Sequence, residues 1–326
     1  IMPSLVGSEM CIRDSINKKF SDSFSIKDLN LVIDHNSFTT LLGPSGCGKT
    51  TVLRMISGLE IPDSGEILFD DKVIFSSEKN INIPPEKRGL GFVFQDFSLW
   101  PHMTVFENVA FPLRAKKNNA DIEQKVLKAL KTVHLDGYEN RFPRELSGGQ
   151  QQRVAFARAI SDNPDCVLFD EPLSALDAIL REQMRLEITK IVKDMGQTAV
   201  FVTHDQEEAM SMSDDIIIMN SGHIEQKASP EDIYKYPKTD FVAQFIGKSN
   251  WLDKNHMIRP EDFTDKEIPG SDLYKTEVVS SQFLGDSYII YLDYMGNNWS
   301  FNSKNGKKAG EILSLYADSK NIKEFN

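Results

Sequence analysis

A run of eight residues, GPSGCGKT at positions 43–50, constrains the fold of this chain more than any other feature. The run fits the pattern G-x-x-x-x-G-K-[S/T], follows a β-rich segment at 37–42 and precedes a helical pattern at 50–56 that ends at Gly58. Because glycines let the backbone close around a phosphate, successive N–H groups and the helix N-terminus face the anion. The order of strand, glycine loop and helix therefore predicts a nucleotide phosphate site in an α/β fold.

Two side chains of this loop have specific expected roles. Lys49 is expected to reach the β and γ phosphates and to act in catalysis, and Thr50 is expected to hold Mg²⁺. ATP and Mg²⁺ are therefore the expected cofactors. The helix N-terminus is also expected to favour the thiolate of Cys47, so that alkylation of this thiol blocks ATP binding. The segment contributes the following predicted nucleotide-binding residues: Gly43, Pro44, Ser45, Gly46, Cys47, Gly48, Lys49, Thr50 and Thr51.

A second apolar run, CVLFDE at positions 166–171, has the pattern of a buried strand that ends in two carboxylates. Ligands gather at the carboxyl ends of the strands in open α/β sheets. Asp170 is the expected acceptor on the Mg²⁺ side. Glu171 points the other way, because side chains alternate along a strand, and is expected to orient or deprotonate the attacking water.

A second glycine-rich helix start lies at positions 146–150, LSGGQ. Helix N-termini attract anions, and this one has no lysine of its own. The segment is therefore expected to form a second anion site that is incomplete by itself. Two such half-sites imply a head-to-tail dimer of two copies of the chain.

The order of the motifs resembles that of the nucleotide-binding subunit of an ABC transporter. The phosphate loop is followed by FQ at 94–95, LSGGQ with QQR at 146–153, DEP at 170–172, SALD at 174–177 and THD at 203–205. The similarity runs from about Ile16 to the end of the chain. The resemblance therefore covers nearly the whole sequence.

The resemblance implies roles for residues outside the phosphate loop. Gln95 is similar to a lid glutamine that senses Mg²⁺ and lies beside the transmembrane partner, and His204 is similar to a histidine that contacts the γ-phosphate. The segment 147–150 resembles a signature that caps the γ-phosphate held by the other protomer, and Asp177 resembles a residue that bridges the protomers. The implied catalytic set is Glu171, His204, Gln95 and Lys49, the metal set is Thr50, Gln95 and Asp170, and the contacts from the second protomer are Ser147, Gly148, Gly149, Gln150 and Asp177.

An aromatic residue near the N-terminus has an implied role on the adenine side. Phe20 lies 23 residues before Gly43, where this family places an aromatic that stacks on the base. Stacking of a base on an aromatic ring is worth about 1 to 3 kcal/mol. Phe24 is the rival for this position, and ordinary packing is the alternative role for Phe20.

The predicted fold class is α/β: a P-loop NTPase with a RecA-like parallel core, an antiparallel β subdomain and a helical insertion, followed by a small OB-like β domain. The nucleotide-binding domain is expected over 16–245, with the helical subdomain over about 96–163 and a T-x-x-E helix start at Thr104 and Glu107. The C-terminal TOBE-like or OB-like domain is expected over 246–326. Residues 1–15 resemble a translated sequencing adapter and are expected to be a non-native leader, with the first strand reduced to 16–20.

The charge and cysteine content exclude several classes of function. The 326 residues carry a formal net charge of −11, which argues against a nucleic-acid platform or a polybasic lipid anchor. No stretch approaches the about 18 to 20 uninterrupted apolar residues that cross a bilayer, so any membrane role is expected to come through a partner. Three cysteines without CxxC spacing fit a reducing cytoplasm. The expected location is peripheral, on the cytoplasmic face of the inner membrane.

Two functions fit a chain with this resemblance. The first is the ATP-hydrolysing subunit of an importer, working with two transmembrane permease subunits and, indirectly, a solute-binding protein. The second is a soluble ABC ATPase in translation or DNA repair, which carries two nucleotide domains or a long coiled coil. The interval between Gly43 and Leu146 holds only about 100 residues without sustained heptads, so the importer is favoured. An exporter would carry a fused membrane domain.

Two further segments suggest a subfamily. The sequences LWPHMTV at 99–105, FIG at 245–247 and IRPED at 258–262 resemble the importers of ferric iron, polyamines, phosphonates and some sugars. Iron or a polyamine such as spermidine or putrescine is the expected cargo. The resemblance also implies that a coupling helix of the permease docks near Gln95 and residues 97–100, where core packing is the alternative role for Leu99 and Trp100.

Overall fold

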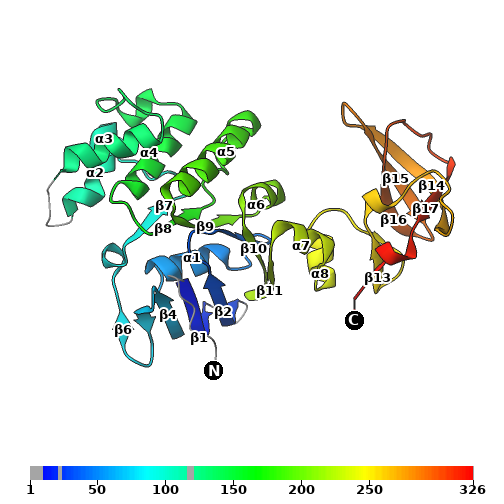
Figure 1. Ribbon diagram of the computed structural model, residues 1–326, viewed down its shortest axis with the longest axis horizontal. Helices are drawn as coiled ribbons and strands as arrows, with labels where there is room; N and C mark the ends of the chain where they lie inside the picture. Colours follow the sequence, from blue (N-terminus) through cyan, green and yellow to red (C-terminus); the bar gives the residue numbers. More distant parts are fainter. Residues whose placement is uncertain (1–9, 21–23, 116–120, 326) are drawn as a thin grey trace. The chain divides into compact units, whose positions relative to one another are not determined.

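The computed structural model describes residues 10–20, 24–115 and 121–325. The chain forms two compact units, which divide between Glu231 and Asp232 (Figure 1). Within the described ranges, no helix has the length and apolar composition needed to cross a membrane.

The first unit is built on a six-stranded sheet with the strand order β11-β10-β3-β9-β8-β7 (Figure 1). Neighbouring strands are parallel, except for β10 and β11. The strands are β3 (Phe38–Leu42), β7 (Leu90–Val93), β8 (Cys166–Asp170), β9 (Thr198–Thr203), β10 (Asp215–Asn220) and β11 (His223–Ala228). The mostly parallel core predicted from the sequence is therefore confirmed.

The central strands of this sheet are buried on both faces. Val167 and Phe169 of β8 belong to one apolar cluster, and Cys166 and Leu168 belong to another. Every residue of β3 and β8 is buried. A strand that is covered on both faces needs apolar residues at nearly every position, which explains the continuous apolar runs in the sequence. The same packing holds Asp170 at the end of a rigid strand.

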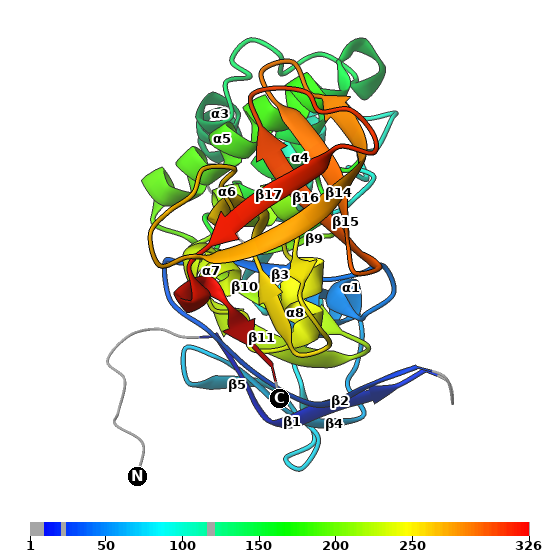
Figure 2. The same ribbon diagram turned by 90° about the vertical axis from the view of Figure 1, so that its right-hand side faces the viewer.

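A second sheet, with the order β2-β1-β4-β5-β6, is antiparallel (Figure 2). Its strands are β1 (Met10–Lys19), β2 (Ser25–Ile33), β4 (Ser64–Phe69), β5 (Lys72–Ser76) and β6 (Ile81–Asn82). The start predicted for the first strand, at residue 16, is corrected: the strand begins at Met10, whose backbone pairs with Ile33 on one side and Phe69 on the other. Residues 10–15 of the expected leader are thus part of the sheet, because both of their neighbouring strands continue that far. The non-native origin of residues 1–15 stays a prediction, and residues 1–9 lie outside the described residues.

The helical insertion between β7 and β8 contains α2 (Val105–Ala115), α3 (Ile122–Thr132) and α4 (Gly148–Ile160), which lie together in Figure 1. The predicted capping box is present at the start of α2. The Glu107 N–H donates to Thr104 Oγ1 over 3.2 Å, and the Thr104 N–H donates to Glu107 Oε2 over 2.8 Å. Val126 and Leu130 of α3 are buried in the same cluster as Val109 of α2. Their spacing is the apolar helix face that the sequence predicts.

Helix α1 (Lys49–Ser57) is held at its C-terminal end by two devices. Gly58 takes the left-handed conformation at φ 83° and donates its N–H to Met55 O, as its place after the helix predicts. The Arg88 guanidinium donates from Nη1 to the carbonyls of Met55 and Ile56 over 2.9 and 2.7 Å. Burial lowers the pKa of Arg88 to about 10. The other α-helices in the described residues are α5 (Ala178–Met195), α6 (Gln206–Met212), α7 (Pro230–Lys235) and α8 (Asp240–Phe245).

The second unit is a small β domain, as predicted. A three-stranded sheet has the order β12-β13-β18, and a four-stranded sheet has the order β16-β15-β14-β17, whose long strands are visible in Figure 2. The buried ring of Trp299 is the centre of its core, with the rings of Phe263, Tyr274 and Tyr294 at 5.1, 5.7 and 4.1 Å between centroids. The strands are β12 (Asn250–Trp251), β13 (His256–Ile258), β14 (Asp272–Phe283), β15 (Tyr288–Tyr294), β16 (Asn297–Ser303), β17 (Ile312–Ala317) and β18 (Lys323–Glu324).

The division between the units falls earlier than the composition suggests, at 231/232 and not at 245/246. A buried arginine explains the difference. Arg259, 2% exposed, donates from Nη1 to the carbonyls of Ala243, Ile246 and Lys248 and from Nη2 to the carbonyl of Tyr234. These bonds attach α8 and the end of α7 to the β domain. Arg259 therefore holds these segments together, because a buried guanidinium needs acceptors for its N–H groups.

Candidate nucleotide site

The phosphate loop curves around the start of α1, and its glycines make the curve possible. Gly46 and Gly48 have φ angles of 80° and 111°, which side chains would strain. The Lys49 Nζ donates to the carbonyls of Gly43 and Pro44 over 2.8 and 3.0 Å, so the ammonium lies over the loop. A pocket of about 360 Å³ opens here, lined by Phe20, Phe24, Ser45, Gly46, Gly48, Lys49, Thr50, Thr51 and Glu171. The structure thus gathers six of the nine residues predicted in the phosphate loop, together with Phe20, around one pocket.

Three residues of the loop lie outside this pocket. Gly43 packs against the backbone of Met219. A Cβ at position 43 would lie 2.2 Å from the Met219 carbonyl oxygen, so only glycine fits. Pro44 and Cys47 line a neighbouring pocket of about 380 Å³ together with Ser45. Gly43 is therefore needed for close packing of the loop, whereas Pro44 and Cys47 face the neighbouring pocket and not the phosphate pocket.

The protonation predicted for Cys47 is wrong. Its thiol is 4% exposed, and burial raises its pKa. The Lys49 Nζ, 3.9 Å from the sulfur, opposes this shift without reversing it. The loss of water around the thiolate outweighs the helix N-terminus and the nearby ammonium, so the neutral thiol is favoured.

This burial changes what alkylation should show. We expect iodoacetamide at pH 8 to label Cys47 at least about tenfold more slowly in the folded chain than in the chain unfolded by urea, because a buried neutral thiol is a poor nucleophile. MgATP should change the rate little. Mass spectrometry of the peptide that contains Cys47 measures the rate, and Cys166, also buried, serves as the internal control. Equal labelling of Cys47 in folded and unfolded protein would contradict the buried position.

Thr50 and Asp170 form the cation side of the site. The Thr50 hydroxyl donates to Asp170 Oδ1 over 2.8 Å, and Arg54 Nη2 lies 3.7 Å from Asp170 Oδ2. Burial raises the pKa of Asp170 despite both neighbours. A buried carboxylate beside a hydroxyl fits Mg²⁺, which prefers oxygen ligands and keeps its other positions for phosphate and water. The residues present therefore suit the cation that the sequence predicts.

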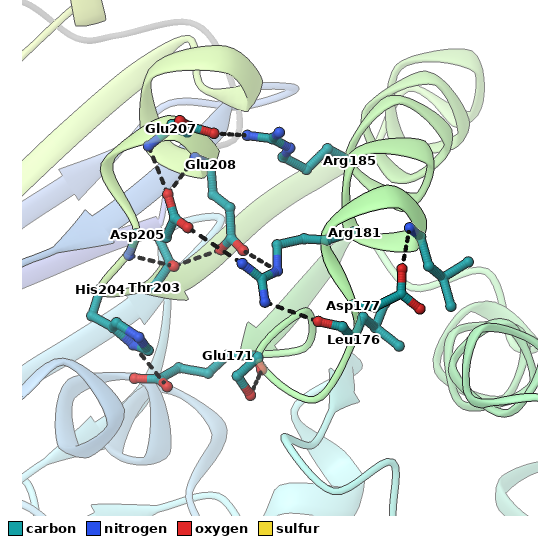
Figure 3. A network of polar contacts seen from close by, with 12 residues as sticks. Glu171, Leu176, Asp177, Arg181, Arg185, Thr203, His204, Asp205, Glu207 and Glu208 are labelled. Atoms are coloured by element: carbon teal, nitrogen blue, oxygen red, sulfur yellow. Dashed lines mark hydrogen bonds and ion pairs between the residues drawn. The ribbon is translucent and has the colours of Figure 1, made fainter. Parts of the chain in front are cut away.

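Glu171 follows Asp170 at the point where the chain leaves the sheet. It has a left-handed φ of 44°, and its N–H donates to the Val202 carbonyl over 3.1 Å. The unusual backbone turns the Glu171 side chain toward His204, whose Nδ1 lies 3.1 Å from Glu171 Oε2 (Figure 3). Non-glycine residues at such φ values are strained and cluster at functional sites. The structure thus joins two residues that are 33 positions apart in the chain.

Gln95 reaches the same site from the end of β7. Its Nε2 lies 3.5 Å from the Ser174 hydroxyl, which in turn donates to the Glu171 carbonyl over 2.9 Å. These two contacts link Gln95, two residues after the end of β7, with the turn that follows β8. Gln95 is therefore near Glu171 and is not one of the residues that line the phosphate pocket.

Both aromatic candidates for the adenine lie at the phosphate pocket. The rings of Phe20 and Phe24 are stacked with 6.2 Å between their centroids and 28° between their planes. Phe20 is half exposed, and Lys18 Nζ lies 5.5 Å from the centre of its ring. The exposed ring argues against ordinary core packing for Phe20. The choice between Phe20 and Phe24 stays open, because both line the pocket.

The signature segment forms the N-terminus of α4, away from the phosphate pocket of its own chain. Ser147 and Gln150 form a capping box: the Gln150 N–H donates to Ser147 Oγ over 3.4 Å, and the Ser147 N–H donates to Gln150 Oε1 over 3.0 Å. Ser147 and Gly148 are exposed, whereas Gly149 is buried. A helix N-terminus with exposed N–H groups suits an anion from outside the chain.

Asp177 is the N-cap of α5, the helix that packs against the signature segment. Its carboxylate accepts the Leu180 N–H over 3.0 Å and so caps α5. A Cβ added to Gly149 would lie 2.8 Å from Leu180 Cδ1. The capped end of α5 and the start of α4 are thus in close contact.

The sequence analysis did not identify Arg181, which the structure places beside this site (Figure 3). Its Nη2 donates to the Leu176 carbonyl over 2.9 Å, and its Nη1 lies 3.8 Å from Asp205 Oδ2. One signal was present in the sequence: a cation close to a helix N-terminus is unfavourable for the helix dipole, so an arginine four residues after Asp177 needs another reason to be there.

The comparisons with known proteins identify the family of the chain. The sequence profile described as ABC transporter matches residues 26–174. The spermidine/putrescine import ATP-binding protein PotA of Acetivibrio thermocellus is 44% identical over an alignment of 334 positions, which covers 94% of this chain and 93% of that protein. The protein of the same name from Clostridioides difficile is 43% identical over an alignment of 342 positions, which covers 95% of this chain and 96% of that protein.

Solved structures show the same fold. MJ0796, a bacterial ABC transporter cassette solved as a dimer, has a TM-score of 0.57 and 33% identity, covering 68% of this chain and 98% of that one. It has also been solved in a post-hydrolysis state bound to ADP and Pi. The cbiO1 protein of Clostridium perfringens, part of the ABC transporter complex cbiONQ, has a TM-score of 0.62 and 28% identity, covering 70% of this chain and 90% of that one.

The curated relatives and the family profile thus agree with the family that the motifs resemble. With 44% identity to a curated relative across 94% of its length, the chain belongs to the ATP-binding proteins of the ABC transporter family, which bind ATP with Mg²⁺ and hydrolyse it.

Proposed function

We propose that this chain is the ATP-hydrolysing subunit of a polyamine importer. The observation that carries the proposal is identity of 42 to 44% over more than nine tenths of the chain to proteins named as spermidine/putrescine import ATP-binding proteins. This similarity includes the C-terminal β domain, which the family profile does not reach. Of the two cargoes expected from the sequence, the polyamine is therefore favoured over ferric iron. The soluble ATPase of translation or DNA repair gains no support from these relatives.

We also propose the roles of the site residues. Lys49 and the backbone of the phosphate loop hold the phosphates, and Thr50 and Asp170 hold Mg²⁺, with Gln95 nearby. The cation neutralises phosphate charge when bound. Glu171 orients the attacking water, and His204, 3.1 Å from its carboxylate, approaches the γ-phosphate. The 3.1 Å contact supports this pairing, because a general base needs a partner that holds its orientation.

The active assembly in this proposal contains two copies of the chain. Each copy presents Ser147, Gly148 and Gly149 to the nucleotide that lies at Lys49 of the other, with Gln150 and Asp177 beside the contact. The exposed N-terminus of α4, which does not reach its own phosphate pocket, supports this arrangement. The dimer of the bacterial cassette MJ0796 supports it as well. ATP then closes the dimer head to tail.

The proposed membrane partners are two permease subunits, with a solute-binding protein as an indirect partner, and the chain lies at the cytoplasmic face of the inner membrane. A pocket of about 260 Å³ between β7 and the helical insertion is lined by Trp100, Phe111, Pro112 and Arg158, among others. The rings of Trp100 and Phe111 are 4.1 Å apart. Leu99 packs into the core, whereas Trp100 lines this pocket, which suits a docked coupling helix.

Uptake of labelled polyamine tests the proposal. The chain is expressed with the permease and binding-protein genes of its own source in bacterial cells that lack polyamine import. We expect uptake of labelled spermidine or putrescine that is lost when Lys49→Ala replaces the native chain, because the phosphates then lose their cation. Labelled ferric iron in the same cells is the control cargo. Uptake of iron and not of polyamine would show that the proposed cargo is wrong, while the assignment of the chain as an importer ATPase would remain valid.

A further inference from the structure

We propose that Arg181 is a positioning residue that holds the turn before Asp177 and the segment after His204 in one arrangement, and so sets the rate of ATP hydrolysis without touching the nucleotide. The inference rests on the proposed roles of His204 and Asp177. It adds a residue that none of the motifs contains.

The guanidinium of Arg181 connects two segments that are far apart in the sequence (Figure 3). On one side, Nη2 donates to the Leu176 carbonyl, directly before Asp177, over 2.9 Å. On the other side, Nη1 lies 3.8 Å from Asp205 Oδ2, directly after His204. Each end of the guanidinium is therefore one residue from a group of the proposed site.

The two carboxylates that face Arg181, those of Asp205 and Glu208, are held by further hydrogen bonds. Asp205 caps α6 by accepting the N–H groups of Glu207 and Glu208 over 2.8 and 3.3 Å. The Thr203 hydroxyl donates to Glu208 Oε2 over 2.5 Å and accepts the Asp205 N–H over 3.0 Å. The residues on both sides of His204 are therefore linked to Glu208 through the Thr203 hydroxyl, and Asp205 carries the other carboxylate that faces Arg181.

Arg181 is also the cation that balances a buried acid. Glu208 is 4% exposed, and Arg181 Nε lies 4.0 Å from its Oε1. Burial raises the pKa of Glu208, and Arg181 opposes this shift more than Arg185 does. Loss of the guanidinium would leave this carboxylate without its nearest positive charge, and the segment that carries His204 would relax.

Arg181 and the Glu171–His204 pair line the same small cavity. Its volume is about 80 Å³, and its lining includes Arg181, Glu171 and His204. Arg181 thus faces the same space as the pair that is proposed to act on water. A movement of about 1 Å in such a pair can cost about 10²-fold in rate.

Steady-state hydrolysis by the purified full chain tests the inference. For Arg181→Gln we expect kcat to fall about 10- to 100-fold, with the KM for ATP within about twofold of the native value, because the phosphate loop is untouched. Arg181→Lys keeps the charge and loses the planar set of donors, so its kcat should lie between those of Arg181→Gln and the native chain. Thermal melting followed by circular dichroism shows that each variant is folded at the assay temperature.

The neighbouring arginine supplies the matched control. Arg185 lies one helical turn further along α5 and pairs with the exposed Glu207 over 3.5 Å. Arg185→Gln should keep kcat within about twofold of the native value. A fall equal to that of Arg181→Gln would mean that general loss of charge on α5 is responsible, and would overturn the inference.

Two further results distinguish a positioning role of Arg181 from a purely structural one. If Arg181→Gln lowers the melting temperature and leaves kcat per folded molecule unchanged, Arg181 is only structural and the inference is wrong. Asp205→Asn combined with Arg181→Gln should lower kcat by less than the product of the two single effects, since both changes break the same connection. Loss of the proposed catalytic roles themselves would appear separately, in the behaviour of Glu171→Gln.

Discussion

Glu171→Gln is expected to lower kcat for ATP hydrolysis by about 10² to 10⁴ while ATP still binds. The amide keeps the size of the side chain and the left-handed backbone at φ 44°, but it no longer accepts a proton from water. With hydrolysis blocked, the ATP-bound dimer should accumulate. Light scattering after size-exclusion chromatography, with and without MgATP, measures the dimer, and release of phosphate measures kcat.

A nearby glutamate provides the control for this change. Glu207 has a side chain that is 82% exposed and lies on the far side of the polar network from Glu171 (Figure 3). Glu207→Gln should therefore hydrolyse ATP at the native rate. If Glu171→Gln retains more than about a tenth of the native kcat, the water is oriented by another group. If it remains monomeric in MgATP at high protein concentration, the proposed dimer is wrong.

Gly149→Ala is expected to lower hydrolysis by about 10²-fold and to leave ATP binding by the single chain unchanged. The expected loss has two sources: the signature N–H groups are proposed to act on the nucleotide of the other copy, and the new Cβ would lie 2.8 Å from Leu180 Cδ1. Lys49 and its pocket lie elsewhere in the same chain. Binding of a fluorescent ATP analogue and release of phosphate measure the two effects separately.

Leu180→Ala separates the two sources. The double variant Gly149→Ala with Leu180→Ala removes the close contact but keeps the extra methyl group at the signature. We expect hydrolysis to stay low in the double variant, because the methyl group at position 149 still lies next to the signature N–H groups, which are proposed to act on the nucleotide of the partner. Recovery of the native rate would show that packing between α4 and α5 was responsible. A weaker affinity of Gly149→Ala for the ATP analogue would contradict the division of the site between two copies.

Local sequence patterns predicted much of this structure correctly. The phosphate loop, the capping box at Thr104 and Glu107, and the C-cap at Gly58 all occur where the pattern placed them. These features depend on neighbours within a few residues, so propensity and hydrogen bonding along the chain decide them. Continuous apolar runs likewise identified the buried parallel strands.

Features that depend on distant residues were predicted less well. The pKa of Cys47 is raised because the fold buries the thiol, which no local pattern reports. Strand β1 extends to Met10 because Ile33 and Phe69 are available as partners on both sides. The division between the units depends on Arg259, whose acceptors are 11 to 25 residues away in the chain.

The sequence by itself determined the family and the cofactors, and it predicted the groups that act on phosphate and Mg²⁺, because these are set by residue type and spacing within short motifs. Only the tertiary structure decided which groups meet. It placed His204 Nδ1 3.1 Å from Glu171, and it joined Leu176 and Asp205 through Arg181. The physical reason is that charge pairing and burial depend on distances in space, and strands adjacent in the sheet bring together residues that the sequence keeps apart.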